Sequence, residues 1–370
     1  MSCIIIITGS SGFIGKRMVQ KIINNTKLIL KSTTYSIPNN TNYKSVNTHN
    51  PTIYILGIDI LGDKINNTNY THIQTDLSKE INNVSIIKQI NELKKIEDIN
   101  SNNIYVLHLA AKISVEESMK NPIMYYNNNF MSTLNILEIM RKSGINNIFF
   151  SSTAAVYDST DNKSSGVTSE SEILPNNVYG YTKYMAEELI KSYIELYNIN
   201  AIIFRFFNVA GGKDTAKPHH LIPVLIQNII DKKPWKVFGK NYKTKDGTCV
   251  RDYVHVDDIS DAFILGICNL NTICISNIIN NKKCTILNLG SKTGYTILDI
   301  MEKVKKILIA SYPSIQIPQT LFCENRDGDP DILIADISEA YDILGWKPKL
   351  TIKNIIIDTM VEYNLEKLNK

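Results

Sequence analysis

Tryptophan, cysteine and histidine are scarce in this sequence, and neither sign of charge predominates. The 370 residues include 2 Trp, 6 Cys and 6 His, and 40 Lys and Arg against 36 Asp and Glu give a formal net charge of +4. A charge this small, without a basic run, is not typical of nucleic-acid binding. We therefore expect no nucleic-acid partner.

The scarcity of cysteine and histidine also argues against metal and disulfide sites. The cysteines form no C-x-x-C pair and no regular spacing. His219 and His220 are adjacent, but no carboxylate or cysteine accompanies them at ligand spacing. The sequence predicts no metal site, and it predicts free thiols in a reducing compartment such as the cytoplasm.

Long hydrophobic runs are lacking as well. The run Ile4–Ile7 near the start is far shorter than the apolar core of a signal peptide, and no cleavage site follows. No apolar run approaches the roughly 20 residues that span a bilayer. We therefore expect no membrane association.

What is present is an alternation of short apolar runs with amphipathic stretches. The runs lack strict apolar/polar alternation, which is typical of parallel strands buried on both faces. Strands are expected at Ile4–Ile7, Ile53–Ile58, Ile104–Leu109, Asn147–Ser151, Ala201–Phe206 and Thr285–Leu289. Helices are expected at Phe13–Asn24, Val84–Ile96, Ser132–Lys142 and Tyr181–Tyr197. The pattern predicts an α/β fold with a Rossmann-type doubly wound parallel sheet.

The pattern changes after Asn208, where loops carry more proline, glycine and charge. We expect a Rossmann domain over residues 1–208 and a smaller C-terminal substrate-binding lobe over most of 209–370, with about 253–290 returning to the Rossmann domain. Two polar segments, Tyr35–Pro51 and Asn271–Lys283, are expected as surface loops.

A glycine-rich segment connects the first predicted strand to the first predicted helix. Glycines there permit a tight turn, close approach to a pyrophosphate and close packing of the helix, whose free N–H groups favour phosphate. The position after a strand and before a helix favours this function over a purely structural turn. The residues expected to bind a dinucleotide are Gly9, Gly12, Phe13, Ile14 and Gly15.

Carboxylates after the next strands are candidates for binding the adenosine half of the cofactor. Asp59 is expected to accept from the ribose hydroxyls, although the insertion at Tyr35–Pro51 places it beyond the usual spacing of about 20 residues. Its charge would repel a 2′-phosphate, so NAD is expected rather than NADP. Asp76 and Leu77 are expected near the adenine, but Asp76 can also be a helix N-terminal residue.

Tyr179 and Lys183 lie four residues apart at the start of a predicted helix and therefore share one face. To act as a base near neutral pH, the phenol needs a pKa roughly 3 units below its ordinary value, and we expect the lysine and a positive nicotinamide ring to lower it. A tyrosine and a lysine four residues apart also occur by chance, so this spacing alone does not identify an active site. Ser151 and Thr153, at the end of a predicted strand, add hydroxyls beside the reacting oxygen.

These motifs together resemble the extended short-chain dehydrogenase/reductase superfamily. Ala110, Ala111 and Asn129 lie in segments similar to its cofactor-contacting loops, and Ser151 joins them. The segment Asp246–Val256, with Phe238 and Gly239, closely resembles the UDP-glucose 4-epimerase family. The resemblance extends from Ile4 to about Leu350.

The resemblance implies roles for further residues that bind a UDP-sugar. It assigns Asn208, Arg251 and Arg326 to the diphosphate, where a guanidinium suits paired oxyanions. It assigns Phe238 to the uracil and Asp329 to the ribose of the nucleotide. His220 and Leu221 complete the substrate-binding set, and His220 departs from the family's asparagine. Further departures, at Ser132, Lys112–Ile113 and Asp158, put the substrate preference in doubt.

The implied activity is the NAD-dependent interconversion of UDP-glucose and UDP-galactose. Tyr179 would take the proton of the sugar 4-hydroxyl, with Thr153 sharing the hydrogen bond, while hydride passes to NAD⁺ and returns to the other face of a 4-keto intermediate. The resemblance also implies a homodimer formed through Ser132–Lys142 and Tyr181–Tyr197.

Other activities were weighed against this one. A 4,6-dehydratase of the superfamily carries Asp-Glu where this chain has Ala154-Ala155, which cannot transfer protons. A non-catalytic NAD-binding module would lack the tyrosine or the lysine. A decarboxylase, a uronate epimerase and an N-acetylglucosamine epimerase stay open. Leu333, at the position that gates acetylated sugars in the family, favours UDP-glucose first.

Overall fold

A computed structural model describes residues 2–33, 51–63, 65–96, 98–158, 166–214, 218, 220–279, 284–325 and 329–365. Arg326 and residues 35–50 of the expected insertion lie outside the described residues, so their predictions are not tested.

Within the described ranges, seven parallel strands form the large sheet, in the order β10-β6-β5-β4-β1-β2-β3. The strands are β1 (Cys3–Thr8), β2 (Ile53–Asp59), β3 (Tyr70–Gln74), β4 (Ile104–His108), β5 (Asn147–Thr153), β6 (Asn200–Phe206) and β10 (Thr285–Leu289). The order reverses between β1 and β4, which is where doubly wound sheets bind ligands. The predicted Rossmann-type sheet is confirmed.

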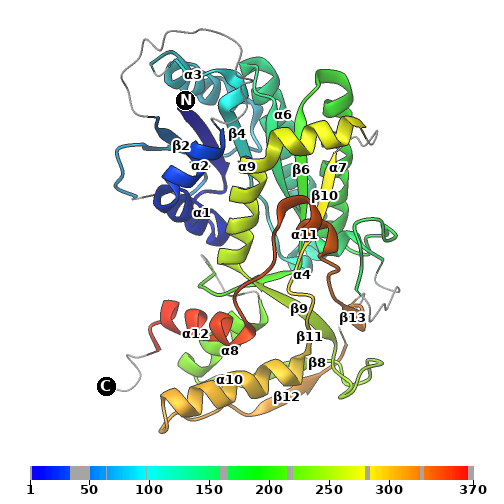
Figure 1. The fold of residues 1–370 in the computed structure, drawn as a ribbon. Coiled ribbons are helices and arrows are strands. Elements are labelled where there is room, and N and C mark those ends of the chain that lie inside the picture. Colours follow the sequence, from blue (N-terminus) through cyan, green and yellow to red (C-terminus); the bar gives the residue numbers. More distant parts are fainter. Residues whose placement is uncertain are drawn as a thin grey trace.

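Helices cover both faces of this sheet (Figure 1). In β1, Ile5 and Ile7 face one layer, whereas Ile4 and Ile6 face the other, so every isoleucine of the run is buried. The first layer is α1 (Phe13–Asn24), α2 (Thr26–Thr33), α9 (Val256–Ile279) and α11 (Ser338–Leu344). The second is α3 (Asn83–Ile96), α6 (Met131–Ser143) and α7 (Val178–Tyr197).

Short helical segments cluster in the connections. They are the 3-10 turns η1 (Glu80–Asn82), η2 (Ser101–Asn103) and η4 (Ala154–Val156), the helices α4 (Val115–Lys120) and α5 (Pro122–Tyr125), and the π-helical turn η3 (Tyr126–Phe130). The helix α5 and the turn η3 run continuously into α6. A π-helical turn is rare and often occurs at functional sites.

The smaller lobe lies below the large sheet in Figure 1 and has its own core, which includes Trp235, Ile300 and Ile356. Its strands are β7 (Asn208–Ala210), β8 (Trp235–Phe238), β9 (Val250–His255), β11 (Gly294–Thr296), β12 (Thr320–Cys323) and β13 (Ile332–Leu333). Its helices are α8 (Leu221–Ile230), α10 (Ile297–Ser311) and α12 (Ile352–Glu362). The domain boundary at 208 stays a prediction.

Helix α9 corrects one expectation and contains the longest apolar stretch among the described helices. Asn271–Ile279, expected as part of a polar loop, is helical, because Ile273 is buried and keeps this end packed in the core. In addition, the 22 residues Val256–Asn277, whose most apolar 18-residue window has a mean hydropathy of 1.5, are long and apolar enough to cross a membrane by length and composition. Half of the most apolar window is buried inside the protein, where the helix packs in the core beside α1.

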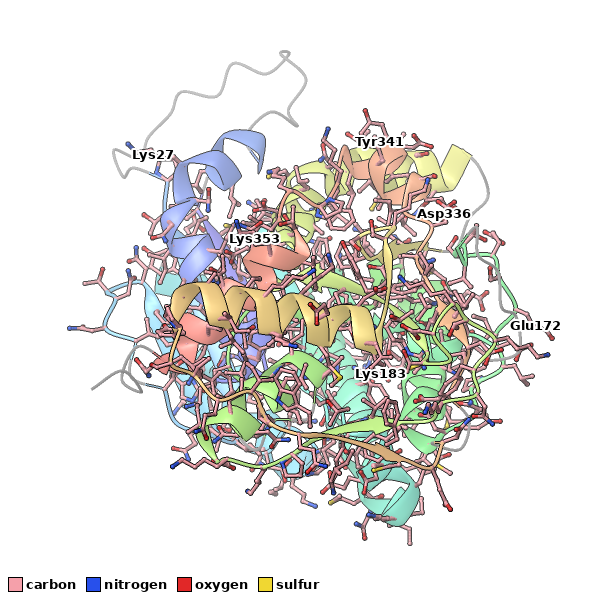
Figure 2. All side chains as sticks on the ribbon, turned by 90° about the horizontal axis from the view of Figure 1, so that it is seen from below. Lys27, Glu172, Lys183, Asp336, Tyr341 and Lys353 are labelled. Atoms are coloured by element: carbon pink, nitrogen blue, oxygen red, sulfur yellow. The ribbon has the colours of Figure 1, made fainter. Side chains whose placement is uncertain are left out.

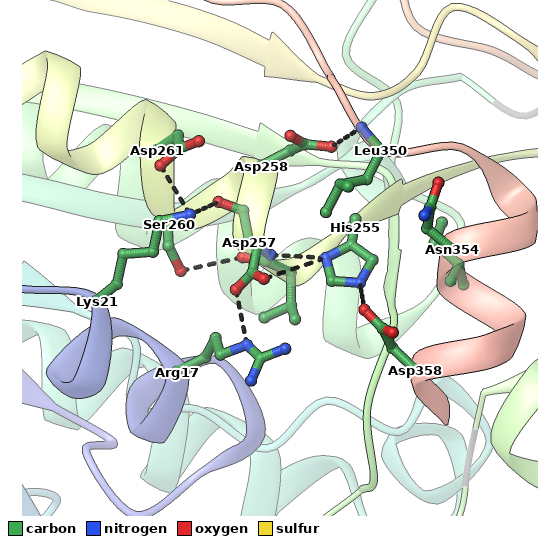
Figure 3. A network of polar contacts seen from close by, with 12 residues as sticks. Arg17, Lys21, His255, Asp257, Asp258, Ser260, Asp261, Leu350, Asn354 and Asp358 are labelled. Carbon is green, nitrogen blue, oxygen red and sulfur yellow. Dashed lines mark hydrogen bonds and ion pairs between the residues drawn. The ribbon is translucent and has the colours of Figure 1, made fainter. Parts of the chain in front are cut away.

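A polar network joins the lobe to the Rossmann layer around His255, whose side chain is fully buried (Figure 3). The N–H of Asp257 donates to Nδ1 of His255 at 3.0 Å, so Nε2 carries the proton and donates to Asp358 of α12, also at 3.0 Å. Arg17 of α1 donates to Asp257 at 2.7 Å. The start of α9 therefore connects α12 to the helix that follows the glycine loop.

Candidate active site

The glycine loop is so tightly packed that a side chain on Gly9 or Gly15 would clash with the neighbouring backbone. Gly9 has a φ of +73°, and a Cβ on Gly15 would lie 2.0 Å from the carbonyl oxygen of Gly9. Gly12 precedes α1 without a side-chain cap, so the first N–H groups of α1 remain available to an anion. This is a cradle that fits a pyrophosphate, next to Phe13 and Ile14.

Asp59 lies beside this loop, as the sequence predicted, although the two are far apart in the chain. Its Oδ2 accepts from the N–H of Ser11 at 3.0 Å, and its Oδ1 accepts from the N–H of Leu61 at 2.9 Å. Each carboxylate oxygen has a second lone pair, so the group can still accept from ribose hydroxyls.

Asp76 has a local role. Its Oδ1 accepts from both the N–H and the hydroxyl of Ser78, at 2.9 and 2.7 Å, which favours the alternative that it fixes the turn into the next helix. Leu77 is buried, and its carbonyl accepts from Asn135 of α6 at 2.9 Å. The adenine contacts of Asp76 and Leu77 stay predictions.

A chain of buried hydroxyls connects the glycine loop to β4, and sequence reasoning missed it. The hydroxyl of Thr8 accepts from the N–H groups of Leu109 and Ala110, each at 3.1 Å, and donates to Nδ1 of His108 at 2.7 Å. Nε2 of His108 then donates to Thr133 at 3.0 Å. The sequence did contain a signal for this chain, because Thr8 is a polar residue at the end of a buried strand, directly before the glycines.

This arrangement keeps His108 neutral. Both ring nitrogens are committed, one as acceptor and one as donor, so a second proton would break a hydrogen bond. Burial, helped by the charge of Lys183, lowers the pKa of His108 to about 3. The side chain of His108 therefore acts as a fixed connector at physiological pH.

Asn129, expected to contact the cofactor, lies in η3 and holds the loop that follows Ala110 and Ala111. Its Oδ1 accepts from the N–H of Lys112 at 2.8 Å, and its Nδ2 donates to the carbonyl of Lys112 and the hydroxyl of Thr182, each at 3.0 Å. This side chain joins the loop to α7, so a role in positioning the cofactor loop has direct support.

Tyr179 and Lys183 lie on the face of α7 that meets the end of β5. Nζ of Lys183 donates to the carbonyl of Ser151 at 2.7 Å, while the Ser151 hydroxyl donates to the carbonyl of His108 at 2.9 Å. The Thr153 hydroxyl lies close enough to the Tyr179 phenol to lower its pKa. Seen from below, Lys183 lies well inside the outline of the molecule, away from Lys27 and Glu172 at its margins (Figure 2). The structure therefore brings together all four residues predicted here.

Two further side chains fix the start of α7, and the sequence pattern did not single them out. Asn177 caps the helix by accepting from the N–H of Gly180 at 2.8 Å, and the buried hydroxyl of Ser118 in α4 accepts from the N–H of Tyr179 at 3.1 Å. Asparagine is a common N-cap, which was a usable signal. The contact from Ser118 depends on tertiary packing.

Burial shifts the pKa values of both members of the pair. Burial raises the pKa of the Tyr179 phenol to about 12, with an opposing effect of the Thr153 hydrogen bond. Burial lowers the pKa of Lys183 to about 7, with Glu187 opposing. Lys183 is not among the causes of the Tyr179 shift, and the lowering expected from the lysine together with a nicotinamide ring stays a prediction.

The predicted substrate residues line strands and helix starts of the lobe. Nη1 of Arg251 donates to the carbonyl of Pro330 at 2.7 Å, and its Nη2 lies 3.4 Å from Asp329. That Nη2 is buried without a hydrogen-bond partner among the described residues, as suits a group that binds an oxyanion. Nδ2 of Asn208 donates to the carbonyl of Asp252 at 2.8 Å, and this bond does not use the Oδ1 acceptor of Asn208.

The remaining predicted substrate residues are more dispersed. His220 precedes α8 and lies 3.3 Å from Asp214, and Leu221 begins that helix. Phe238 ends β8. Leu333 pairs with Arg251 across β13 and β9 and packs on the cluster that contains Ala154.

Residues 5–280 match the model of a family described as the NAD dependent epimerase/dehydratase family. The chain belongs to this family. Similar proteins include the UDP-glucose 4-epimerase of Lactobacillus helveticus, which is 38% identical over 253 residues, or 66% of this chain and 72% of that protein. The UDP-glucose 4-epimerase of Lacticaseibacillus casei is 34% identical over 288 residues, 76% of this chain and 80% of its own length.

Solved structures agree with this membership of the NAD-dependent epimerase/dehydratase family. A crystal structure of UDP-glucose 4-epimerase matches with a TM-score of 0.75 and 28% identity, over 99% of this chain and 98% of the other. The UDP-Glc/GlcNAc 4-epimerase from Campylobacter jejuni matches with a TM-score of 0.69 and 26% identity, over 98% and 100% of the two chains.

The neutral His108 predicts a pH dependence of stability. The unfolded chain binds the proton near the ordinary pKa of 6.5, whereas the folded chain binds it near 3. The free energy of unfolding should therefore fall as pH drops from 6.5 to 3, by about 1.4 kcal/mol per pH unit from this group. His108→Gln keeps an acceptor and a donor but cannot be protonated. Urea unfolding of both proteins between pH 7 and 4 measures the difference, and parallel curves would contradict the prediction.

Proposed function

We propose that this chain is an NAD-dependent UDP-glucose 4-epimerase that interconverts UDP-glucose and UDP-galactose. The observation that carries the proposal is the convergence of Tyr179, Lys183 and Thr153 at the end of β5, in a chain of this family. The names of the relatives at 34–38% identity support the choice of substrate.

The chain's own residues fit NAD. The cradle of Gly9, Gly12 and Gly15 would hold the pyrophosphate and Asp59 the adenosine ribose, and Lys183 would lie by the nicotinamide end. When bound, NAD supplies a hydride acceptor and donor together with a positive ring charge. Asp59 disfavours a 2′-phosphate through repulsion, which supports NAD over NADP.

Tyr179 would exchange the proton of the sugar 4-hydroxyl. Its place in the first turn of α7 favours the phenolate, because the helix N-terminus carries partial positive charge. Thr153 would direct its hydroxyl to the same oxygen, and the protonated Lys183 would stabilise negative charge beside it.

Arg251 and Asn208 would hold the UDP group while the sugar turns between two orientations. The buried Nη2 of Arg251, which has an ion-pair contact with Asp329 but no hydrogen bond among the described residues, could donate to a diphosphate oxygen. Binding energy from the nucleotide would thus retain the ketone in the site. Roles for Phe238, His220, Leu221, Asp329 and Arg326 in UDP-sugar binding rest on the family resemblance.

Tyr179→Phe should abolish turnover, with a loss of at least about 100-fold in kcat, because the phenol that exchanges the proton is missing. NAD should remain bound, since the glycine cradle is unchanged. NMR of UDP-glucose mixtures measures the formation of UDP-galactose, and NAD released on denaturation measures the cofactor.

Tyr181→Phe is the matched control, because Tyr181 is exposed on the same helix and should lose nothing. Undiminished activity of Tyr179→Phe would reject the assigned base. Production of a 4-keto-6-deoxy sugar or a pentose, without UDP-galactose, would reject the epimerase itself.

Acetylated sugars are the second candidate substrates, and Leu333 is the residue that bears on them. It is partly buried against the cluster around Ala154 and Tyr157, next to Arg251 in register. Leu333→Ser removes a large apolar side chain, so kcat/KM for UDP-N-acetylglucosamine should rise relative to that for UDP-glucose, by about 10-fold. Steady-state kinetics with both substrates tests this. An unchanged ratio would exclude Leu333 as the gate.

We further propose a cytoplasmic homodimer formed through α6 and α7. The six cysteines are free, which suits a reducing compartment. Helix α7 exposes Met185, Leu196 and Tyr197, which are apolar enough to be covered by a second copy. Sedimentation at micromolar concentration should show the dimer, and only monomer would contradict it.

A further inference from the structure

A third residue on the acid–base face of α7 also contacts the end of β5. Tyr179, Lys183 and Glu187 are four residues apart and therefore lie in one row along the helix. They meet three consecutive residues of the strand: Tyr179 meets Thr153, Nζ of Lys183 meets the carbonyl of Ser151, and Glu187 accepts a hydrogen bond from the hydroxyl of Ser152.

Glu187 is fully buried and ion-paired with Arg205 of β6, which is 2% exposed. The guanidinium forms a two-pronged contact, with Nε 3.0 Å from Oε1 and Nη2 2.7 Å from Oε2. A buried ion pair rarely adds stability over apolar side chains of similar volume, because both charges lose their hydration. A buried pair beside a reactive lysine therefore calls for a role other than stability.

Arg205 is itself held from the opposite side. Its Nη1 donates to the hydroxyl of Tyr157 at 3.1 Å and to the carbonyl of Ser169 at 3.0 Å, and its guanidinium lies over the Tyr157 ring. Tyr157 donates in turn to Asn288 of β10 at 2.5 Å. The carboxylate of Glu187 is thus connected to β5, β6 and, through Arg205 and Tyr157, β10. It can therefore hold α7 at one height, meaning a fixed position along the direction of the strands.

Glu187 also affects the charge of Lys183. Burial lowers the pKa of the lysine to about 7, and the Glu187 carboxylate acts in the opposite direction. The same contact that fixes the helix therefore favours the ammonium form, which the proposed chemistry needs beside the Tyr179 oxygen.

We propose that Ser152, Glu187 and Arg205 are positioning residues that set the height of α7, and hence the placement of Tyr179 and Lys183 against Thr153. This inference rests on the epimerase function proposed above. Because a misplacement of about 1 Å at a reacting group can cost on the order of 100-fold in rate, a contact one turn away is sufficient to control turnover.

Ser152→Ala tests the positioning role with the fold preserved, because Glu187 keeps its contacts with Arg205. We expect kcat for UDP-glucose to fall roughly 10-fold, with KM changed less than about twofold, since the residues that bind the nucleotide are untouched. Ser192→Ala is the matched control: it lies on α7, and among the described residues its hydroxyl bonds only the carbonyl of Leu189 in its own helix, at 2.7 Å.

Glu187→Gln tests the electrostatic part. Loss of the negative charge lowers the pKa of Lys183, so the alkaline limb of the kcat profile should move to lower pH by roughly one unit, whereas Ser192→Ala should leave it in place. A purely structural role would lower the melting temperature without moving this limb. If Glu187→Gln does not fold, the kcat and KM of Ser152→Ala decide.

The wild-type assay separates the two proposals. An inactive wild type rejects the epimerase function and the inference with it. If the wild type is active but Ser152→Ala keeps the wild-type kcat, only the positioning role is rejected. The same holds if Ser152→Ala loses activity through a change in KM alone.

Discussion

The contact between α7 and the end of β5 is the constraint on which the proposed chemistry depends. It buries Lys183, whose Nζ finds its acceptor in a strand carbonyl, and it places Tyr179 against Thr153. Burial alone drives the two pKa values in opposite directions, toward a neutral lysine and a neutral phenol. The carboxylate of Glu187 opposes the shift of the lysine pKa. Charged groups that arrive with the ligands then determine how far both pKa shifts are reversed.

The rest of the Rossmann domain positions the other half of the site relative to this contact. The Thr8–His108–Thr133 chain joins the glycine loop to α6, and Asn129 joins the adjacent loop to α7. Because these bonds are buried and each hydroxyl has a defined direction, the cradle and the acid–base face are held as one unit. Across the sheet, the network at His255 connects the lobe that carries Arg251 to α1.

Much of this arrangement could be predicted from the sequence, because parallel strands buried on both faces read as apolar runs and the glycine loop has a fixed context. Helix α1 has the predicted bounds. Strand β3 was missed because Thr71, His72 and Gln74 interrupt its apolar pattern. The end of α9 was missed because its asparagines and threonine make the segment polar overall, although Ile273 within it is buried. Ser118 and Glu187 could not be found from local pattern, since their partners are 61 and 18 residues away.

The central claim is that burial between α7 and β5 controls the charge of Lys183, and the titration of that side chain tests it most directly. Lysine labelled with ¹³C at Cε can be followed by NMR between pH 5 and 11, with the Lys183→Gln variant identifying the resonance. The account predicts a midpoint near 7 for Lys183, well below the ordinary 10.5. A midpoint close to 10.5 would show a solvated ammonium and would contradict the account.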